Sequence, residues 1–135
     1  MREVERRQFV DAKPAELDDR LSPATVLEAE GTFSVVGTTD ADDGTRVTAR
    51  GGGVEAEFVF ERLPDGLHYR QVGSRGPFES METTLTYAAR DHGCDVTVRS
   101  AVSLGLPLAP LTDRIAAWKR RGELDRLLDR LETGH

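Results

Sequence analysis

Five polar side chains fall in register with apolar neighbours in stretches that alternate like β-strands. They are Arg6, Gln8, Gln71, Thr83 and Ser100. A polar group in a core needs a hydrogen-bond partner, so these residues either orient the head group of a bound molecule or bond to each other or to water at strand ends. Arg6 is the most specific, because a guanidinium in a cavity favours a carboxylate or phosphate. The alternative is an arginine that reaches solvent or pairs with a glutamate.

The same alternation predicts one apolar face for the strands. Its members are Val10, Val54, Ala56, Phe58, Phe60, Leu67, Tyr69, Met81, Leu85, Tyr87, Val96, Val98, Val102 and Leu104. Most should form the core, and those near the middle could line a pocket. Together with the five polar residues, the predicted ligand-binding set includes Phe58, Phe60, Tyr69, Met81, Val98 and, from the C-terminal helix, Trp118. Facing inward, Trp118 would form a pocket wall or simply the largest core side chain.

Other residues capable of chemistry show no catalytic or metal-binding pattern. Glu55, Glu57 and Glu61 resemble a set of paired carboxylates, but their strand parity places them on the solvated face. The histidines are far apart and none is spaced as a metal ligand; Cys94 is the single cysteine, which excludes an internal disulfide. The sequence therefore predicts no catalytic group, metal or cofactor.

Composition restricts the possible partners. The chain has 135 residues, the size of one domain (1–135), with 38% hydrophobic and 31% charged residues. A net charge of −6 disfavours nucleic acid as a partner. Of 18 basic residues only Lys13 and Lys119 are lysine, a bias that indicates salt adaptation or a GC-rich genome. The charged beginning and the absence of a long apolar run predict a cytoplasmic protein without a membrane span.

The elements that must position these residues can be read from the turn residues that separate them. A strand at 3–12 precedes short helices at 14–21 and 23–29, for which Ser22 and Pro23 are good starting residues. Six strands follow, at 32–39, 45–50, 54–62, 67–73, 78–89 and 94–104, and then a helix at 110–132. Tight turns between consecutive strands predict an antiparallel meander, whose apolar face only the long helix can cover. The fold class is α+β, with a seven-stranded antiparallel sheet.

The C-terminal helix carries two apolar stripes. At about 100° per residue, Leu111, Ile115, Trp118 and Gly122 form one stripe, and Leu124, Leu127, Leu128 and Leu131 lie almost opposite. A straight helix cannot press both stripes onto one sheet, so we expect a kink, bulge or break within two residues of Gly122. The alternatives are a continuous helix with Trp118 partly exposed, and a dimer contact through one stripe.

Three segments carry a resemblance to a known family. FVDAKPAEL resembles a strand-to-helix opening, LSPATVLEAEGTF a short second helix that leads into a strand, and GCDVTVRSAVSLGLPLAP the last strand before a long helix. In this order they resemble the SRPBCC superfamily, the START, polyketide-cyclase and birch-pollen-allergen-like group. The chain is most similar to uncharacterised archaeal-type members and to accessory subunits of carbon monoxide dehydrogenase. The resemblance implies a helix-grip fold, in which a curved sheet wraps the C-terminal helix around a cavity for apolar or amphipathic molecules.

Three functions remain open at this point. The first is a non-catalytic carrier or sensor that binds a lipophilic or amphipathic small molecule between sheet and helix. The second is an accessory or interaction protein, for example a homodimer, whose cavity is filled by its own side chains. The third is an enzyme of the cyclase or hydrolase type, which a strongly shifted acid in a deep pocket would favour.

Overall fold

The computed structural model describes residues 2–42, 44–51, 53–72, 80–103 and 109–133, with the side chains of helix α3 described from Arg114 onward. Its elements are β1 (Arg2–Val10), α1 (Pro14–Arg20), α2 (Pro23–Glu30), β2 (Ser34–Ala41), β3 (Gly44–Gly51), β4 (Val54–Leu63), β5 (Gly66–Val72), β6 (Ser80–Arg90), β7 (Gly93–Ser103) and α3 (Ala109–Thr133). The predicted order of strand, two helices, six strands and helix is confirmed. Leu104 and the predicted turn at 74–77 lie outside the described residues.

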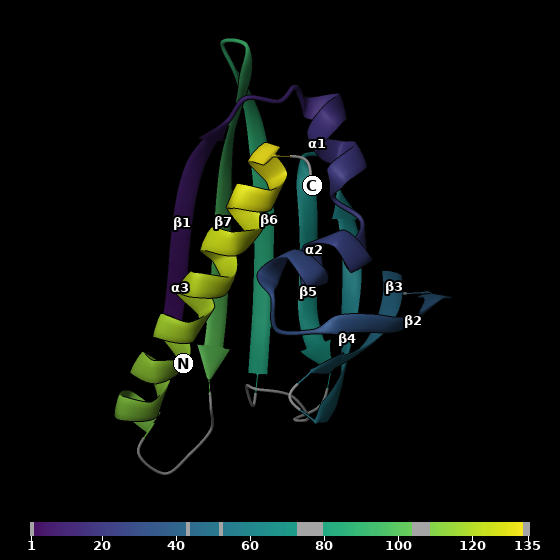
Figure 1. Ribbon diagram of the computed structural model, residues 1–135, viewed down its shortest axis with the longest axis vertical. Coiled ribbons are helices and arrows are strands. Elements are labelled where there is room, and N and C mark those ends of the chain that lie inside the picture. Colours follow the sequence, from purple (N-terminus) through teal and green to yellow (C-terminus); the bar gives the residue numbers. More distant parts are fainter. Residues whose placement is uncertain (1, 43, 52, 73–79, 104–108, 134–135) are drawn as a thin grey trace.

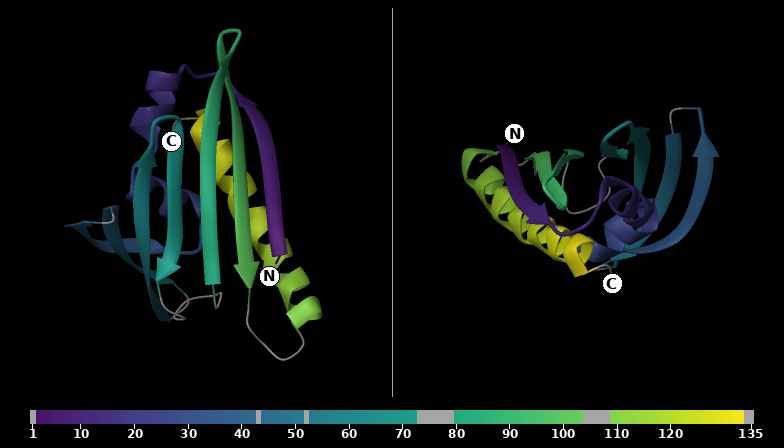
Figure 2. Two further views of the ribbon diagram at one scale, coloured as in Figure 1. Left: turned by 180° about the vertical axis from the view of Figure 1, so that it is seen from behind. Right: turned by 90° about the horizontal axis from the view of Figure 1, so that it is seen from above.

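The seven strands form one curved antiparallel sheet. Its order is β1-β7-β6-β5-β4-β3-β2, so every strand after β2 pairs with its sequence neighbour and β1 closes the far edge against β7. Helix α3 crosses one face of the sheet, where it packs mainly on β1 and β7 and against α2 (Figures 1 and 2). This arrangement confirms the helix-grip fold.

Local sequence signals set the position of α2, which proves important for the site. The Ser22 side chain accepts a hydrogen bond from the backbone N–H of Thr25, and Pro23 occupies the first turn. The helix ends at Gly31, whose φ of 87° lies in the left-handed region that favours glycine. Glu30 is therefore the last residue of α2 and faces the interior beside α3.

The core contains most of the predicted apolar face. Phe58, Phe60, Tyr69, Met81 and Val98 are all buried. Val54 is an exception, because it is the first residue of β4 and is 40% exposed. Within the described residues no helix is long and apolar enough to span a bilayer.

Helix α3 has no break at Gly122, and the alternative of a continuous helix with an exposed Trp118 describes it. Helix α3 runs without interruption from Ala109 to Thr133. It buries one face along its described length, formed by Ala116, Ala117, Arg120, Glu123, Leu124, Leu127, Leu128 and Leu131. These positions recur every three to four residues, as a straight helix requires.

Candidate functional site

Trp118 does not face the sheet, contrary to the prediction that placed it in the ligand-binding set. Its exposed fraction is 72%, and that of Ile115 is 55%. The prediction assumed that the apolar residues of the helix mark its inner face. Between Arg114 and Glu123 the inner face of α3 instead carries small and charged residues, and Ile115 and Trp118 lie in solvent.

The charged residues on the inner face of α3 are the main feature of the site. The exposed fraction of Arg120 is 1% and that of Glu123 is 2%, although both belong to residue types that are seldom fully buried. Glu30, at the end of α2, is 3% exposed and completes the group. We call Arg120, Glu30 and Glu123 the buried ion cluster. Such a cluster is stable only if its charges are paired and its hydrogen bonds are made.

All three nitrogens of the Arg120 guanidinium are engaged. Nη1 lies 2.8 Å from Glu30 Oε1 and 3.3 Å from Glu123 Oε1. Nε donates to Ser100 Oγ at 2.9 Å, while Nη2 donates to Tyr69 OH at 2.9 Å and to Thr83 Oγ1 at 2.8 Å. Four of its N–H groups thus donate hydrogen bonds, and Nη1 also forms an ion pair with Glu30.

The sheet side of the cluster is held in place by further contacts. The Tyr69 hydroxyl donates to Glu30 Oε1, and the Tyr69 ring stacks on Phe60 with centroids 4.6 Å apart. Thr83 and Ser100 face each other on paired strands, with hydroxyl oxygens 2.7 Å apart. The acceptors of Arg120 are thus fixed by strand register and ring stacking.

The second carboxylate, Glu123, has partners at the surface as well. Its Oε2 accepts from the Thr32 hydroxyl and lies 3.6 Å from Lys119 Nζ. Lys119 also donates to Thr32 Oγ1 at 3.2 Å, and its side chain is 39% exposed. Glu123 therefore connects the buried guanidinium to a cation at the surface.

Burial shifts the proton affinities of this cluster. It raises the pKa of Glu30, an effect that the positive charge of Arg120 only partly offsets. It also raises the pKa of Tyr69 well above its ordinary value, and the nearby Glu30 charge adds to the increase. Burial alone would lower the pKa of Arg120, but Glu30 and Glu123 outweigh it and raise that pKa, so the guanidinium stays charged.

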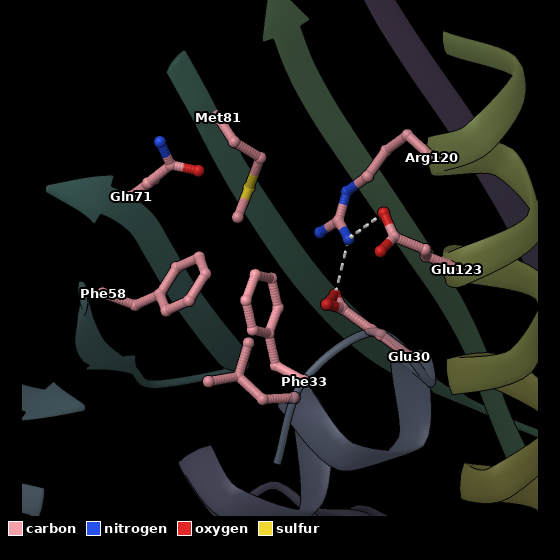
Figure 3. Close-up of a pocket in the computed structure, with 8 residues that line it drawn as sticks. Glu30, Phe33, Phe58, Gln71, Met81, Arg120 and Glu123 are labelled. Carbon is pink, nitrogen blue, oxygen red and sulfur yellow. Dashed lines mark hydrogen bonds and ion pairs between the residues drawn. The ribbon is translucent and has the colours of Figure 1, made fainter. Parts of the chain in front are cut away.

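A small cavity lies between this cluster and an apolar wall (Figure 3). It is lined by Leu27, Glu30, Phe33, Phe58, Gln71, Met81, Arg120 and Glu123. Phe33 and Phe58 meet edge to face, with centroids 5.7 Å apart, and form the wall opposite the ions. The volume in which the centre of a water molecule fits is about 10 Å³, enough for a single water.

The structure brings some of the predicted residues to this cavity and places others elsewhere. Phe58, Gln71 and Met81 line it, whereas Tyr69, Thr83 and Ser100 hold its arginine. Phe60 and Val98 do not line the cavity: the Phe60 ring stacks on Tyr69, and Val98 is fully buried in the core.

Arg6 and Gln8 lie away from the cavity, on β1. Arg6 Nε is 3.1 Å from Asp125 Oδ1, and Gln8 donates to Glu132 at 2.6 Å. Both contacts join β1 to the outer part of α3. Arg6 thus matches the alternative of an arginine paired with an acid near solvent, and not that of a ligand-binding guanidinium.

Arg120, Glu30, Glu123, Leu27 and Phe33 were not predicted. A signal for two of them exists in the sequence. Continuing the stripe of Leu131, Leu128, Leu127 and Leu124 toward the N-terminus in steps of three and four leads to Glu123 and Arg120. A charged pair on the inner stripe of a gripped helix was therefore detectable from spacing.

Among the described residues no group of three or more His, Cys, Asp or Glu side chains could hold a metal ion. The arrangement is that of an apolar cavity with polar groups converging at one end, which suits an amphipathic molecule.

Comparisons with known proteins agree with the fold. Residues 1–134 match the family described as "Polyketide cyclase / dehydrase and lipid transport". No curated protein matches the sequence.

Solved structures with the same fold are similar over nearly their whole length. XoxI from Bacillus cereus has a TM-score of 0.74 at 10% identity, covering 99% of this chain and 95% of its own. A START superfamily protein from Mycobacterium smegmatis has a TM-score of 0.73 at 13% identity, covering 98% and 99%. The Aha1 dimer from Colwellia psychrerythraea has a TM-score of 0.66 at 18% identity, covering 99% and 98%. The match to the family over residues 1–134, on a helix-grip fold, shows that the chain belongs to the polyketide cyclase / dehydrase and lipid transport family of the SRPBCC superfamily.

Proposed function

We propose that the protein binds a small lipophilic or amphipathic molecule between its sheet and α3, as a non-catalytic carrier or sensor. The observation that supports this function is the asymmetry of the cavity. Leu27, Phe33, Phe58 and Met81 form its apolar part, and the buried ion cluster lies at its other end. This combination suits a ligand with an apolar body and one polar group.

The cavity must widen to admit such a ligand. Pockets that hold drug-sized molecules measure roughly 300–1,000 Å³, far above the space present here. Among the apolar lining residues, Phe33 and Met81 have the largest exposed fractions, 8% and 5%. Met81 is unbranched and adapts its shape easily. We expect these two side chains to move apart when the ligand enters.

Native mass spectrometry of protein purified without detergent tests this function. The expected result is a bound lipid-like mass that survives desalting, together with binding of an apolar fluorescent dye. The variant Met81→Ala should bind the dye more strongly, because it enlarges the cavity. Val102→Ala is the matched control, since Val102 pairs with Met81 across β6 and β7 and is buried outside the cavity. A ligand-free spectrum with no dye binding in either the wild type or Met81→Ala would refute the proposal.

One observation favours a different function, that of an accessory or interaction protein. The cavity is almost filled by its own side chains, while Ile115 and Trp118 are exposed on α3. An exposed apolar stripe suits a protein contact, such as a homodimer interface. If this function is correct, Trp118→Ala will change the sedimentation of the protein and dye binding will be absent.

A further observation bears on the cyclase- or hydrolase-type enzyme. The raised pKa of Glu30 means that its carboxyl keeps its proton to a higher pH than an ordinary glutamate, as a general acid requires. Glu30 lines the cavity, so it could reach a bound molecule. Turnover of a bound polyketide-like substrate that is lost in Glu30→Gln, with binding retained, would favour this alternative over a carrier.

A further inference from the structure

We propose that the cavity selects ligands whose polar end is uncharged and donates a hydrogen bond, such as an alcohol or a phenol, and discriminates against carboxylates and phosphates. This inference rests on the proposed ligand-binding function and specifies the ligand class. It runs against the simplest expectation for a cavity that contains an arginine, which is that the arginine binds an anion.

The first step is the state of Arg120. Its three nitrogens already donate hydrogen bonds to Glu123, Ser100, Tyr69 and Thr83 and form an ion pair with Glu30, all within 3.3 Å. An incoming anion would have to displace one of these acceptors. Displacing Glu30 would leave a buried carboxylate without its cation, and displacing Glu123 would leave it with Lys119 alone, and both changes are unfavourable.

The second step concerns the other nearby cation. Lys119 does not line the cavity, and its ammonium is engaged by Thr32 and Glu123 toward the surface. Of the residues that line the cavity, Arg120 is the only cation, and it faces two glutamates. An anionic head group would therefore meet two carboxylates and no available positive charge.

The third step concerns the polar groups of the cavity that can form a hydrogen bond with a ligand. Its polar lining consists of Glu30, Glu123 and Arg120, with Gln71 on the opposite side (Figure 3). Because the donors of Arg120 are used, the carboxylate oxygens are the groups of the cluster that can accept a further hydrogen bond. A hydroxyl can supply that bond without adding charge.

The size of the space agrees with this choice. The volume in which the centre of a water molecule fits, about 10 Å³, is enough for one water. A hydroxyl is the ligand group that most closely reproduces the size and hydrogen bonding of water, so an alcohol can place its oxygen there while its chain lies along Phe33, Phe58 and Met81. Replacing a water by a group that repeats its hydrogen bonds keeps affinity.

A matched series of octyl compounds tests the selectivity. The neutral dye Nile red is bound to the full chain and displaced with 1-octanol, octanoate or methyl octyl ether, at a pH where octanoate is ionised. These ligands share a chain length and differ in their polar end. We expect 1-octanol to bind at least about tenfold more tightly than octanoate. The ether, which accepts but does not donate, should bind more weakly than the alcohol.

A variant that removes the charge of one carboxylate tests whether the buried ion cluster causes the selectivity. Glu123→Gln keeps the side-chain shape and removes one negative charge. The ratio of the affinities for 1-octanol and octanoate should therefore become smaller. Glu61→Gln, on the exposed face of β4, is the control and should leave it unchanged. Octanoate binding as tightly as 1-octanol to the wild type would overturn the selectivity and leave the ligand-binding function intact. Failure of Nile red and of every octyl compound to bind would overturn both.

Discussion

At the scale of single residues, Arg120 is the side chain on which most of the interior polar contacts depend. Removing it leaves Glu30 buried without a cation and leaves Glu123 with only the half-exposed Lys119. Breaking a buried ion pair from one side typically costs about 3–5 kcal/mol of unfolding free energy, and we expect Arg120→Ala to fall in this range. Denaturant unfolding monitored by circular dichroism measures the loss.

Arg6→Ala is the control for this prediction. Arg6 also pairs with an acid on or beside α3, but its side chain is 39% exposed and that of Asp125 is 55% exposed. Exposed pairs contribute less than about 1 kcal/mol, so Arg6→Ala should be nearly neutral. Similar losses in the two variants would show that the interior cluster does not stabilise the fold as its geometry indicates.

Trp118 provides a direct test of the orientation of α3. It is the only tryptophan of the chain, so intrinsic indole fluorescence reports on it alone. With 72% of its surface exposed, it should be quenched efficiently by acrylamide and should not respond to a ligand in the cavity. A blue-shifted emission that is protected from acrylamide would show that Trp118 is covered, either by the sheet or by a partner.

The difference between sequence and structure is clearest at these same residues. Alternation in the strands correctly predicted that Tyr69, Met81, Thr83 and Ser100 face the interior, because a strand has a strict period of two and one apolar face. Alternation cannot tell which interior side chains meet, since that depends on strand order and on the helices. The pairing of β1 with β7 and the approach of α2 to α3 supplied this information.

The inner face of α3 was predicted wrongly for a different reason. Apolar character is a guide to burial only where the buried contacts are themselves apolar. In α3 the inner stripe passes through Arg120 and Glu123, so hydrophobicity selected the opposite face, with Ile115 and Trp118. The same departure from pattern marks the candidate site, as local rules tend to fail where polar groups are buried for a purpose.

At the scale of the elements, alanine substitutions at two glycines near the site should have opposite effects on the unfolding free energy. Gly122 lies in the interior of α3, and a Cβ atom there would meet only Arg126 Nη1, at an ordinary 3.5 Å. Alanine favours the helix over glycine by about 0.8–1 kcal/mol, so Gly122→Ala should raise the unfolding free energy by up to that amount.

Gly31→Ala is its counterpart and should destabilise the protein. Gly31 ends α2 with a φ of 87°, and its added Cβ would lie 2.8 Å from Arg126 Nε. That nitrogen also donates to the Glu30 carbonyl at 2.8 Å, so the strain would reach the end of α2 that carries Glu30. Thermal unfolding of both variants checks the pair; a lower melting temperature for Gly122→Ala would indicate that this glycine serves a close contact after all.

At the scale of the whole molecule, the buried ion cluster couples stability to pH. The pKa of Glu30 is raised above its ordinary value of 4.5 by burial, so the folded state binds this proton more tightly than the unfolded state. The stabilisation from the bound proton is fully present below the unfolded pKa and is lost as pH rises through the folded pKa. The glutamine in Glu30→Gln does not bind this proton, so the unfolding free energy of that variant lacks this contribution to its pH dependence. The unfolding free energy of the wild type minus that of Glu30→Gln should therefore fall as pH rises from about 4.5.

Glu5, an exposed residue of β1, is the control, because its pKa is shifted in the opposite direction from that of Glu30. A hydrogen bond from Arg7 lowers the pKa of Glu5, so its contribution is present above the unfolded pKa and is lost as pH falls through the folded pKa. The stability difference between the wild type and Glu5→Gln should therefore rise with pH below about 4.5, whereas the difference for Glu30→Gln falls above about 4.5. Equilibrium denaturation of the three proteins across this pH range measures both slopes. A difference for Glu30→Gln that rises with pH would mean that the Arg120 charge, and not burial, controls the proton affinity of Glu30. The interior of the helix grip would then be better hydrated than the burial of Glu30 indicates.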